Sequence, residues 1–257
     1  MPYVSSSPVR LYCFPHAGAT SLVYRGWQPL GEPHLLVRGV DAPGRGTRRQ
    51  ERRAVGFRAL VRAMAEPVVA DLLAEGERGP GPRWVTFGHS FGSTTSLAVA
   101  AEVARQVGVA PERAVLSGAV PPGLQRPGPL LDDVPDEQLL ARTADDGGTP
   151  SAVLADPTMS RILLRMLRED DAVRGEFAQQ ASGLRVDFPL TLIAAREDAY
   201  APPEKVWQWS AHSSAPTRRV EIDGGHFAAV RCPKETLTTI LDDTEPGEGY
   251  PHGARQV

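Results

Sequence analysis

The stretch FGHSFGS, residues 87–93, places a serine between two glycines directly after an apolar run. The pattern Gly-x-Ser-x-Gly is typical of a nucleophile elbow, a sharp turn from a strand into a helix that exposes the serine hydroxyl. The turn strains the serine backbone, and Gly88 and Gly92 let neighbouring chain pass close by. An apolar run before the motif and a helical pattern after it favour this interpretation over a simple small-residue turn. Ser90 is therefore the predicted nucleophile.

A serine nucleophile needs a base that takes its proton, and the base needs a carboxylate that fixes its tautomer. In α/β-hydrolases the acid and then the histidine follow the serine along the chain. Three histidines follow Ser90, and only His226 lies in a Gly-rich loop directly after an apparent strand. His212 lies in a polar segment and His252 close to the end of the chain. His226 is the predicted base.

Asp198 is the predicted acid because it follows the apolar run 190–195 and precedes a Pro-Pro pair that can open the next helix. Its neighbour Glu197 is an alternative. Asp223 is a weaker candidate because it lies only three residues before His226. The loop after the apparent strand 114–117 contains no acid, which favours Asp198 further.

Acyl transfer at a serine also needs N–H groups that stabilise the oxyanion. One is expected from Phe91, the residue after the nucleophile. The other is expected from Ala17, in the Gly-containing loop that follows the apolar run 9–14. A simple strand-to-helix turn is also compatible with that loop.

Short apolar runs alternate with helical patterns along the chain, which predicts one α/β domain with a mostly parallel central sheet and helices on both faces. The predicted strands are 9–14, 35–40, 84–87, 114–117, 190–194 and 219–222. Helical patterns without a strand occupy about 121–185, and we expect a lid insertion at the carboxyl ends of the strands, with a plain core-covering excursion as the alternative. The domain should span 9–241, between a flexible N-terminus, 1–8, and a disordered tail, 242–257.

The composition is ordinary for a globular protein: 41% hydrophobic and 23% charged residues with a net charge of -3 argue against a nucleic-acid surface. No apolar run is long enough for a membrane span, and no export signal is found. The two cysteines, Cys13 and Cys232, are predicted to be reduced and buried, which favours a cytoplasmic location. No metal and no organic cofactor is expected.

The elbow and five further motifs make the chain resemble the type II thioesterases, free-standing enzymes of the α/β-hydrolase fold that accompany polyketide synthases and nonribosomal peptide synthetases. The resemblance covers residues 11–240. Its motifs are CFPHAG (13–18), APGRG (42–46), FGHSFG (87–92), LSG (116–118), a run from DVPDEQLL to GGTP (133–150) and GGHF (224–227).

The resemblance implies the same three residues in the same roles, with Ser90 as nucleophile, Asp198 as orienting acid and His226 as base. It also implies hydrolysis of acyl groups from the phosphopantetheine arm of acyl or peptidyl carrier proteins, which clears stalled or aberrant units during antibiotic biosynthesis. The partner would be such a carrier protein. The oligomeric state stays open, with a monomer as the expectation.

The predicted lid carries apolar side chains at helical spacing, and these are candidates for an acyl pocket, with core packing as the alternative: Leu139, Leu140, Ile162, Leu163, Met166 and Leu167. A run of arginines is a candidate docking surface for an acidic carrier, with a solvated loop as the alternative: Arg45, Arg48, Arg49, Arg52 and Arg53.

Three other functions use the same fold or the same residues. A carboxylesterase would hydrolyse oxygen esters with the same triad, and a dedicated chain-release or acyltransfer enzyme would use the same acyl-enzyme. A non-catalytic hydrolase-fold binding protein would keep the fold and have lost the chemistry.

Overall fold

The computed structural model of the protein describes residues 8–76, 81–125, 131–180 and 183–244. Of the predicted terminal segments, residues 1–7 and 245–257 lie outside the described chain. Within the described residues, six strands form one sheet: β1 Val9–Phe14, β2 Leu35–Gly39, β3 Trp84–His89, β4 Arg113–Ser117, β5 Leu190–Ala195 and β6 Thr217–Ile222.

The sheet has the order β2-β1-β3-β4-β5-β6, and each neighbouring pair is parallel. The predicted parallel sheet is therefore confirmed, and each strand lies within two residues of its predicted ends. The chain moves outward from β1 to β2 and then returns to β3 on the other side of β1. The loops after β1 and β3 consequently meet at the reversal point, where α/β proteins bind ligands.

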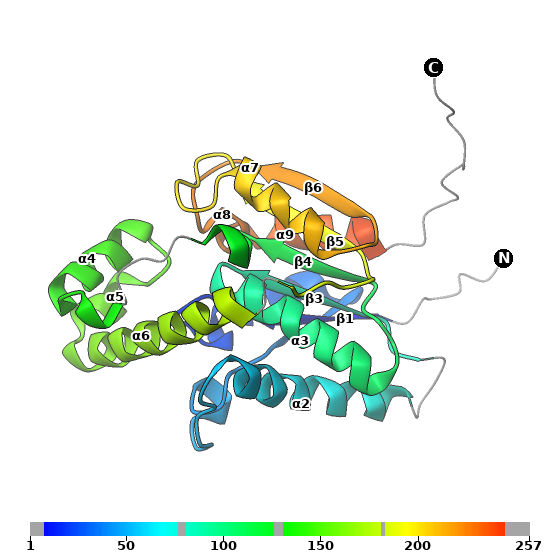
Figure 1. The fold of residues 1–257 in the computed structure, drawn as a ribbon, viewed down its shortest axis with the longest axis horizontal. Helices are drawn as coiled ribbons and strands as arrows, with labels where there is room; N and C mark the ends of the chain where they lie inside the picture. Colours follow the sequence, from blue (N-terminus) through cyan, green and yellow to red (C-terminus); the bar gives the residue numbers. More distant parts are fainter. Residues whose placement is uncertain (1–7, 77–80, 126–130, 181–182, 245–257) are drawn as a thin grey trace.

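Helices cover both faces of the sheet (Figure 1). The α-helices are α1 Gln28–Gly31, α2 Phe57–Gly76, α3 Phe91–Val107, α4 Asp136–Asp146, α5 Ser151–Ala155, α6 Pro157–Gln180, α7 Pro203–Val206, α8 Ala228–Arg231 and α9 Pro233–Thr244. Short 3-10 helices are η1 Ser21–Trp27, η2 Gly46–Arg48, η3 Pro122–Leu124, η4 Leu131–Asp133 and η5 Trp207–His212. None of the helices in the described chain is long and apolar enough to cross a bilayer.

A hydrophobic core lies between the sheet and the helices on each of its two faces, because successive side chains of a strand point to opposite faces. In β1, Tyr12 and Phe14 pack with α2 and α3, whereas Leu11 and Cys13 pack with η1, α8 and α9. β1, β3 and β5 are buried along their whole length. Parallel strands that are covered on both faces have continuous runs of apolar residues, and these runs made the strands predictable from the sequence.

Between β4 and β5, all the named elements of the described chain are helices, from η3 to α6. Figure 1 shows α4, α5 and the first part of α6 extending beyond the carboxyl ends of the strands, away from the sheet. Val134, Leu139 and Leu164 form a small separate core there. The predicted insertion of helices is therefore present at the edge of the sheet that carries the functional loops.

One predicted burial is wrong. Cys13 is buried and Cys232 is exposed, and both thiols are free. Cys232 follows the single turn of α8, whose Ala228 and Ala229 face the core. The chain turns outward after them, so that apolar neighbours in sequence do not bury the cysteine.

Candidate active site

Ser90 lies between β3 and α3 with φ 54° and ψ -122°, and it is the one non-glycine residue with positive φ in the described chain. Such a conformation is costly for a side chain and persists only where the surroundings impose it. The neighbouring glycines explain the turn: a Cβ on Gly88 would overlap the carbonyl of Gly92, and a Cβ on Gly92 would overlap the carbonyl oxygen of Phe14. The motif therefore forms the sharp turn that its glycines predict.

Hydrogen bonds to β4 hold the elbow in place. The N–H of Ser90 donates to the carbonyl of Ser117 over 2.8 Å. The hydroxyl of Ser93 lies 2.7 Å from the carbonyl of Gly88 and 2.8 Å from that of Ser117, and it accepts the N–H of Ser117 over 3.0 Å. Ser93 and Ser117 therefore fix the backbone below Ser90, a role that the sequence analysis missed.

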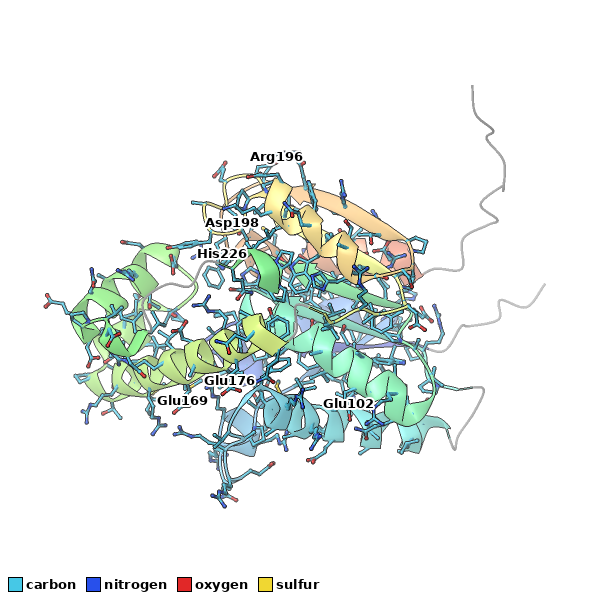
Figure 2. All side chains as sticks on the ribbon, in the orientation of Figure 1. Glu102, Glu169, Glu176, Arg196, Asp198 and His226 are labelled. Carbon is cyan, nitrogen blue, oxygen red and sulfur yellow. The ribbon has the colours of Figure 1, made fainter. Side chains whose placement is uncertain are left out.

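His226 and Asp198 come from neighbouring loops, since β5 and β6 pair side by side. His226 Nδ1 lies 2.7 Å from Asp198 Oδ2. Asp198 Oδ1 accepts the N–H groups of Tyr200 and Ala201 over 2.8 and 3.0 Å. Figure 2 shows the two labelled side chains together at the end of the sheet that faces the helical segment.

Asp198 is only 2% exposed. Burial by itself raises the pKa of this carboxyl, but the hydrogen bond and charge of His226 and the two backbone N–H groups outweigh burial and lower the pKa. The carboxylate is thus held ionised where it can orient the imidazole and stabilise its protonated form.

The alternative acids and histidines lie elsewhere. Asp223 is exposed and pairs with Arg196, which Figure 2 shows at the outer edge of the molecule. Glu197 is exposed and makes no contact with His226 among the described interactions. His212 Nδ1 lies 2.7 Å from the carbonyl of Leu184, and His252 is outside the described residues.

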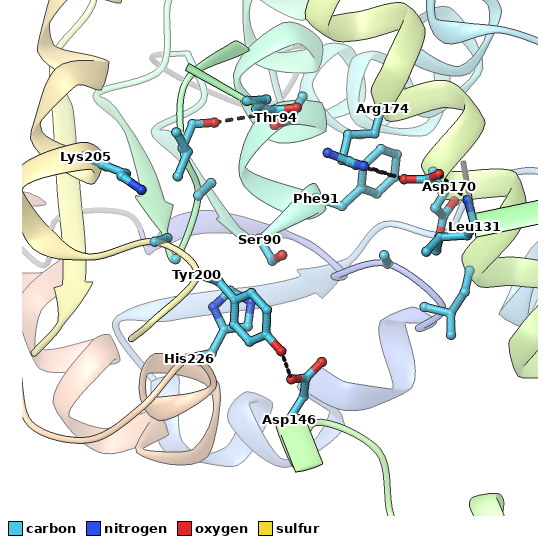
Figure 3. Close-up of a pocket in the computed structure, with 18 of the residues that line it drawn as sticks. Ser90, Phe91, Thr94, Leu131, Asp146, Asp170, Arg174, Tyr200, Lys205 and His226 are labelled. Carbon is cyan, nitrogen blue, oxygen red and sulfur yellow. Dashed lines mark hydrogen bonds and ion pairs between the residues drawn. The ribbon is translucent and has the colours of Figure 1, made fainter. Parts of the chain in front are cut away.

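A cavity of about 520 Å³ opens at these loops and is lined by both Ser90 and His226. Figure 3 shows the two side chains facing this space, with Tyr200 beside His226. No hydrogen bond joins Ser90 Oγ to His226 in the described part of the chain. Such bonds are often long in the absence of substrate and shorten when substrate binds. The described residues also bring no three potential metal-ligating side chains together.

The two predicted oxyanion donors, Ala17 and Phe91, line the same cavity. Ala17 lies in a turn of residues 16–19, closed by a 3.1 Å hydrogen bond from the N–H of Ala19 to the carbonyl of His16. Phe91 begins α3, so that its N–H is one of the unpaired groups of a helix start. Within the described residues neither N–H has an acceptor, and both are available to a bound oxygen.

Two further histidine rings lie near His226. The ring centroid of buried His89 lies 4.9 Å from that of His226, and His16 packs 4.8 Å from the ring of Phe227. Burial, and to a lesser degree the charge of His226, lowers the pKa of His16 to about 4. The same causes lower the pKa of His89. The lowered pKa values favour the neutral form of both rings, which pack beside His226.

The wall of the cavity is mixed. Its apolar members include Val120, Leu124, Leu131 and Leu167, and its charged members are Asp146, Asp170, Asp171, Arg174 and Lys205. Of the six lid side chains predicted for an acyl pocket, Leu167 lines the described cavity.

The other five predicted side chains are not on this wall. Leu139 packs in the small core of the helical segment with Leu140 against it, and Ile162 is exposed. Leu163 and Met166 are buried, and Leu163 lies against the turn at Gly18. All six side chains have helical spacing, but five of them pack in other places or face solvent instead of lining the cavity.

The end of α4 touches the loops that carry Asp198 and His226. The hydroxyl of Tyr200 donates to Asp146 Oδ1 over 2.6 Å, as Figure 3 shows. Arg231 donates to the carbonyl of Gly147, and a Cβ on Gly148 would overlap the ring of Phe227. Residues 146–148 therefore contact both loops and border the cavity.

The arginine run does not form one exposed surface. Arg45 and Arg48 are mostly buried: Arg45 pairs with Asp170, and Arg48 donates to the carbonyl of Ala63 and pairs with Glu51. Arg53 is exposed and pairs with Glu169. Arg49 and Arg52 are exposed and have no ion pair within the described chain. The surface predicted from the run is thus smaller than the run itself.

Comparisons with known proteins show the family of the chain. A family model described as "Thioesterase domain" matches residues 9–245. The chain is 31% identical over 222 residues to the thioesterase PikA5 of Streptomyces venezuelae, over 86% of this chain and 76% of that protein.

Solved structures are similar in fold and in sequence. RedJ, a thioesterase from the prodiginine biosynthetic pathway in Streptomyces coelicolor, has a TM-score of 0.74 and 28% identity, over 95% of this chain and 96% of that chain. BorB, a type II thioesterase from the borrelidin biosynthetic cluster, has a TM-score of 0.74 and 26% identity, over 95% of each chain.

Proposed function

Because the chain belongs to the thioesterase domain family, we propose that it hydrolyses acyl thioesters at Ser90, with His226 as base and Asp198 as orienting acid. The observation that carries this assignment is the 2.7 Å hydrogen bond between His226 and Asp198 beside the strained Ser90, on the wall of one cavity. The fold and the family make the chain a hydrolase, and these residues are its proposed catalytic residues.

In the first step His226 Nε2 takes the proton of Ser90 while Oγ attacks the thioester carbonyl. Asp198 holds the Nδ1 proton and stabilises the positive imidazolium. The negative oxygen that forms would lie between the N–H groups of Ala17 and Phe91, which have no other acceptor in the described chain. These donors are fixed before the reaction, so little reorganisation is needed when the charge develops.

The C–S bond then breaks, and the leaving sulfur takes the proton of the imidazolium directly or through solvent, so that His226 is again a neutral base. Little acid assistance is needed, since thiols have a pKa near about 8.5. Water, deprotonated by His226, attacks the acyl-Ser90 ester and releases the carboxylic acid, which restores the serine.

The proposed substrate is an acyl group on the phosphopantetheine arm of an acyl or peptidyl carrier protein. Support comes from the relatives, since RedJ and BorB are described as thioesterases of biosynthetic pathways or clusters. Removal of stalled or aberrant units would be the corresponding task. Both described cysteines are free, as is usual for proteins of a reducing compartment, and we place the reaction in the cytoplasm.

The helical segment between β4 and β5 is the proposed lid. It supplies Leu131 and Leu167 to the cavity wall, and its residues 146–148 contact the loops of the acid and the base. Acyl groups would enter between this segment and the sheet. The charged members of the wall favour acyl groups that are short or carry polar substituents over long unbroken alkyl chains.

A matched substrate pair tests the function. The wild-type enzyme and Ser90→Ala are compared on an acyl-pantetheine thioester and on the oxygen ester of the same acyl group. We expect the thioester to be the better substrate, and Ser90→Ala to lower kcat by more than about a thousandfold. Preference for the oxygen ester would favour a carboxylesterase, and turnover by Ser90→Ala at the wild-type rate would overturn the assignment.

A further inference from the structure

A carboxylate on α6 reaches the turn that carries the proposed oxyanion donor Ala17. Asp170 Oδ2 accepts the N–H of Gly18 over 2.8 Å, although 152 residues separate the two in sequence. Asp170 is 4% exposed and lies on the wall of the cavity. Figure 3 shows it on the side of the cavity formed by α6.

The hydrogen bond acts on the part of the turn that decides its geometry. In the turn of residues 16–19 the central peptide joins Ala17 to Gly18, and Gly18 has φ +73°. The two common turn types differ in the orientation of this peptide, and positive φ at the third position belongs to only one of them. Because Asp170 accepts the N–H of that peptide, it holds the turn in the orientation observed.

Packing against α6 also prevents a residue with a side chain from replacing Gly18 in this turn. A Cβ on Gly18 would lie 2.8 Å from Leu167 Cδ2 and 2.9 Å from Leu163 Cδ1, both on α6. The turn therefore rests directly on α6, and a shift of that helix would move both the side chains against Gly18 and the acceptor of its N–H.

Arg45 stabilises the buried carboxylate of Asp170. Its Nη1 lies 2.7 Å from the same oxygen, Asp170 Oδ2, and its Nη2 donates to the carbonyl of Met166 and to Glu169 over 3.3 and 3.2 Å. Figure 2 shows Glu169 on α6, on the side toward α2. A buried carboxylate is retained where it has such a partner and further hydrogen bonds. Arg45 thus serves this carboxylate rather than an exposed docking surface.

We propose that Asp170, held by Arg45, is a positioning residue for oxyanion stabilisation: it holds the turn of residues 16–19 against α6, and with it Ala17, the proposed donor on the cavity wall. This role rests on the proposed function at Ser90. It also connects the proposed lid with the reaction, since the helix that borders the acyl cavity carries the acceptor that orients the oxyanion turn.

Three variants test this role. Asp170→Ala removes the acceptor. Asp170→Asn keeps one oxygen, which can accept both the Gly18 N–H and Arg45, because both donate to the same oxygen in the wild-type protein. Arg168→Ala is the matched control: it removes hydrogen bonds from α6 to Asp136 and to the carbonyls of Leu131 and Val134, without touching the turn.

Two measurements separate positioning from packing. The first is kcat and KM with a small acyl-pantetheine thioester. The second is the inhibition constant of an analogue in which a trifluoromethyl ketone replaces the thioester, since addition of the serine to the ketone creates an oxyanion without turnover. Melting temperatures show whether each variant is folded. Asp170→Ser, whose side chain is too short to reach Gly18, replaces Asp170→Ala if the latter does not fold.

We expect Asp170→Ala to lower kcat by on the order of a hundredfold with KM nearly unchanged, and to weaken the ketone by a similar factor. Asp170→Asn should recover most of both losses, and Arg168→Ala should resemble wild type. Equal, small effects of Asp170→Ala and Arg168→Ala would overturn the role, as would a loss of kcat without a loss of ketone affinity. Activity in Ser90→Ala would instead overturn the proposed function, whatever the Asp170 variants do.

Discussion

His226 Nδ1 and Asp198 Oδ2 lie 2.7 Å apart, and the other carboxylate oxygen is occupied by the N–H groups of Tyr200 and Ala201. The two oxygens of Asp198 therefore have separate partners. One is anchored to its own loop by the backbone, and the other faces the imidazole. This division determines how a conservative substitution at the acid would behave.

Asp198→Asn should inactivate the enzyme without unfolding it. The two backbone donors would keep the amide oxygen, so that the NH₂ group would face His226 Nδ1. The imidazole would then carry its proton on Nε2 and could not accept the proton of Ser90. We expect kcat to fall by on the order of ten thousandfold. Steady-state kinetics beside a thermal melt check this, and a kcat within tenfold of wild type, roughly the effect of a lost structural contact, would speak against the assigned acid.

Gly92→Ala should destabilise the fold, because its Cβ would overlap the carbonyl oxygen of Phe14. We expect the free energy of unfolding to fall by about 3 kcal/mol. Gly175→Ala is the matched control: it is also a helical glycine, and a Cβ there meets nothing within 4 Å. Its effect should be neutral or stabilising by about 1 kcal/mol or less. Urea unfolding compares the two, and equal stabilities would show that β1 does not constrain the elbow.

Acid should weaken the fold through His16. Burial and the charge of His226 lower its pKa from 6.5 to about 4 in the folded chain. Below the unfolded pKa the unfolded chain binds a proton that the folded chain does not, so that the free energy of unfolding falls with falling pH between these two values. This single group contributes about 3 kcal/mol over that range.

His16→Phe should remove this contribution. His89, whose pKa is also lowered by burial, leaves a remaining dependence in the same direction. Urea midpoints at about pH 7 and about pH 4.5 measure the difference. The variant should lose less stability than wild type between the two, and an identical loss would mean that His16 is protonated in the folded chain.

Tyr200→Phe should loosen the proposed lid. The substitution removes the 2.6 Å hydrogen bond from the hydroxyl to Asp146 at the end of α4, a bond that raises the pKa of Tyr200 to about 12. We expect amide hydrogen exchange in α4 to accelerate by up to about tenfold, while exchange in β3 stays unchanged. Unchanged exchange in α4 would show that the other contacts of this segment, such as the bond from Arg231 to Gly147, hold it without the Tyr200 hydroxyl.

The sequence predicted those parts of the molecule that depend on local patterns. Buried parallel strands read as apolar runs, and Ser90, Asp198 and His226 each follow one of them. Parallel strands place their carboxyl ends at one edge, so that the three residues could be grouped before the structure was known.

The features that depend on the position of α6 could not be predicted from the sequence. Arg45 and Asp170 are 125 residues apart, and nothing in the charge pattern distinguishes an arginine that turns inward from one that faces solvent. Helical spacing likewise identified the apolar stripes of α4 and α6, but it does not say which side chains face the cavity. Leu167 lines it, whereas Leu139 packs within the helical segment.

Loss of acyl groups from carrier proteins tests the central claim most directly. A panel of carriers loaded with short, polar and long acyl groups is incubated with wild type or Ser90→Ala, and the intact mass of each carrier is followed. The account predicts Ser90-dependent loss of several short or polar groups and slower loss of long ones. Retention of every acyl group by the carriers, with simple oxygen esters still hydrolysed, would contradict it.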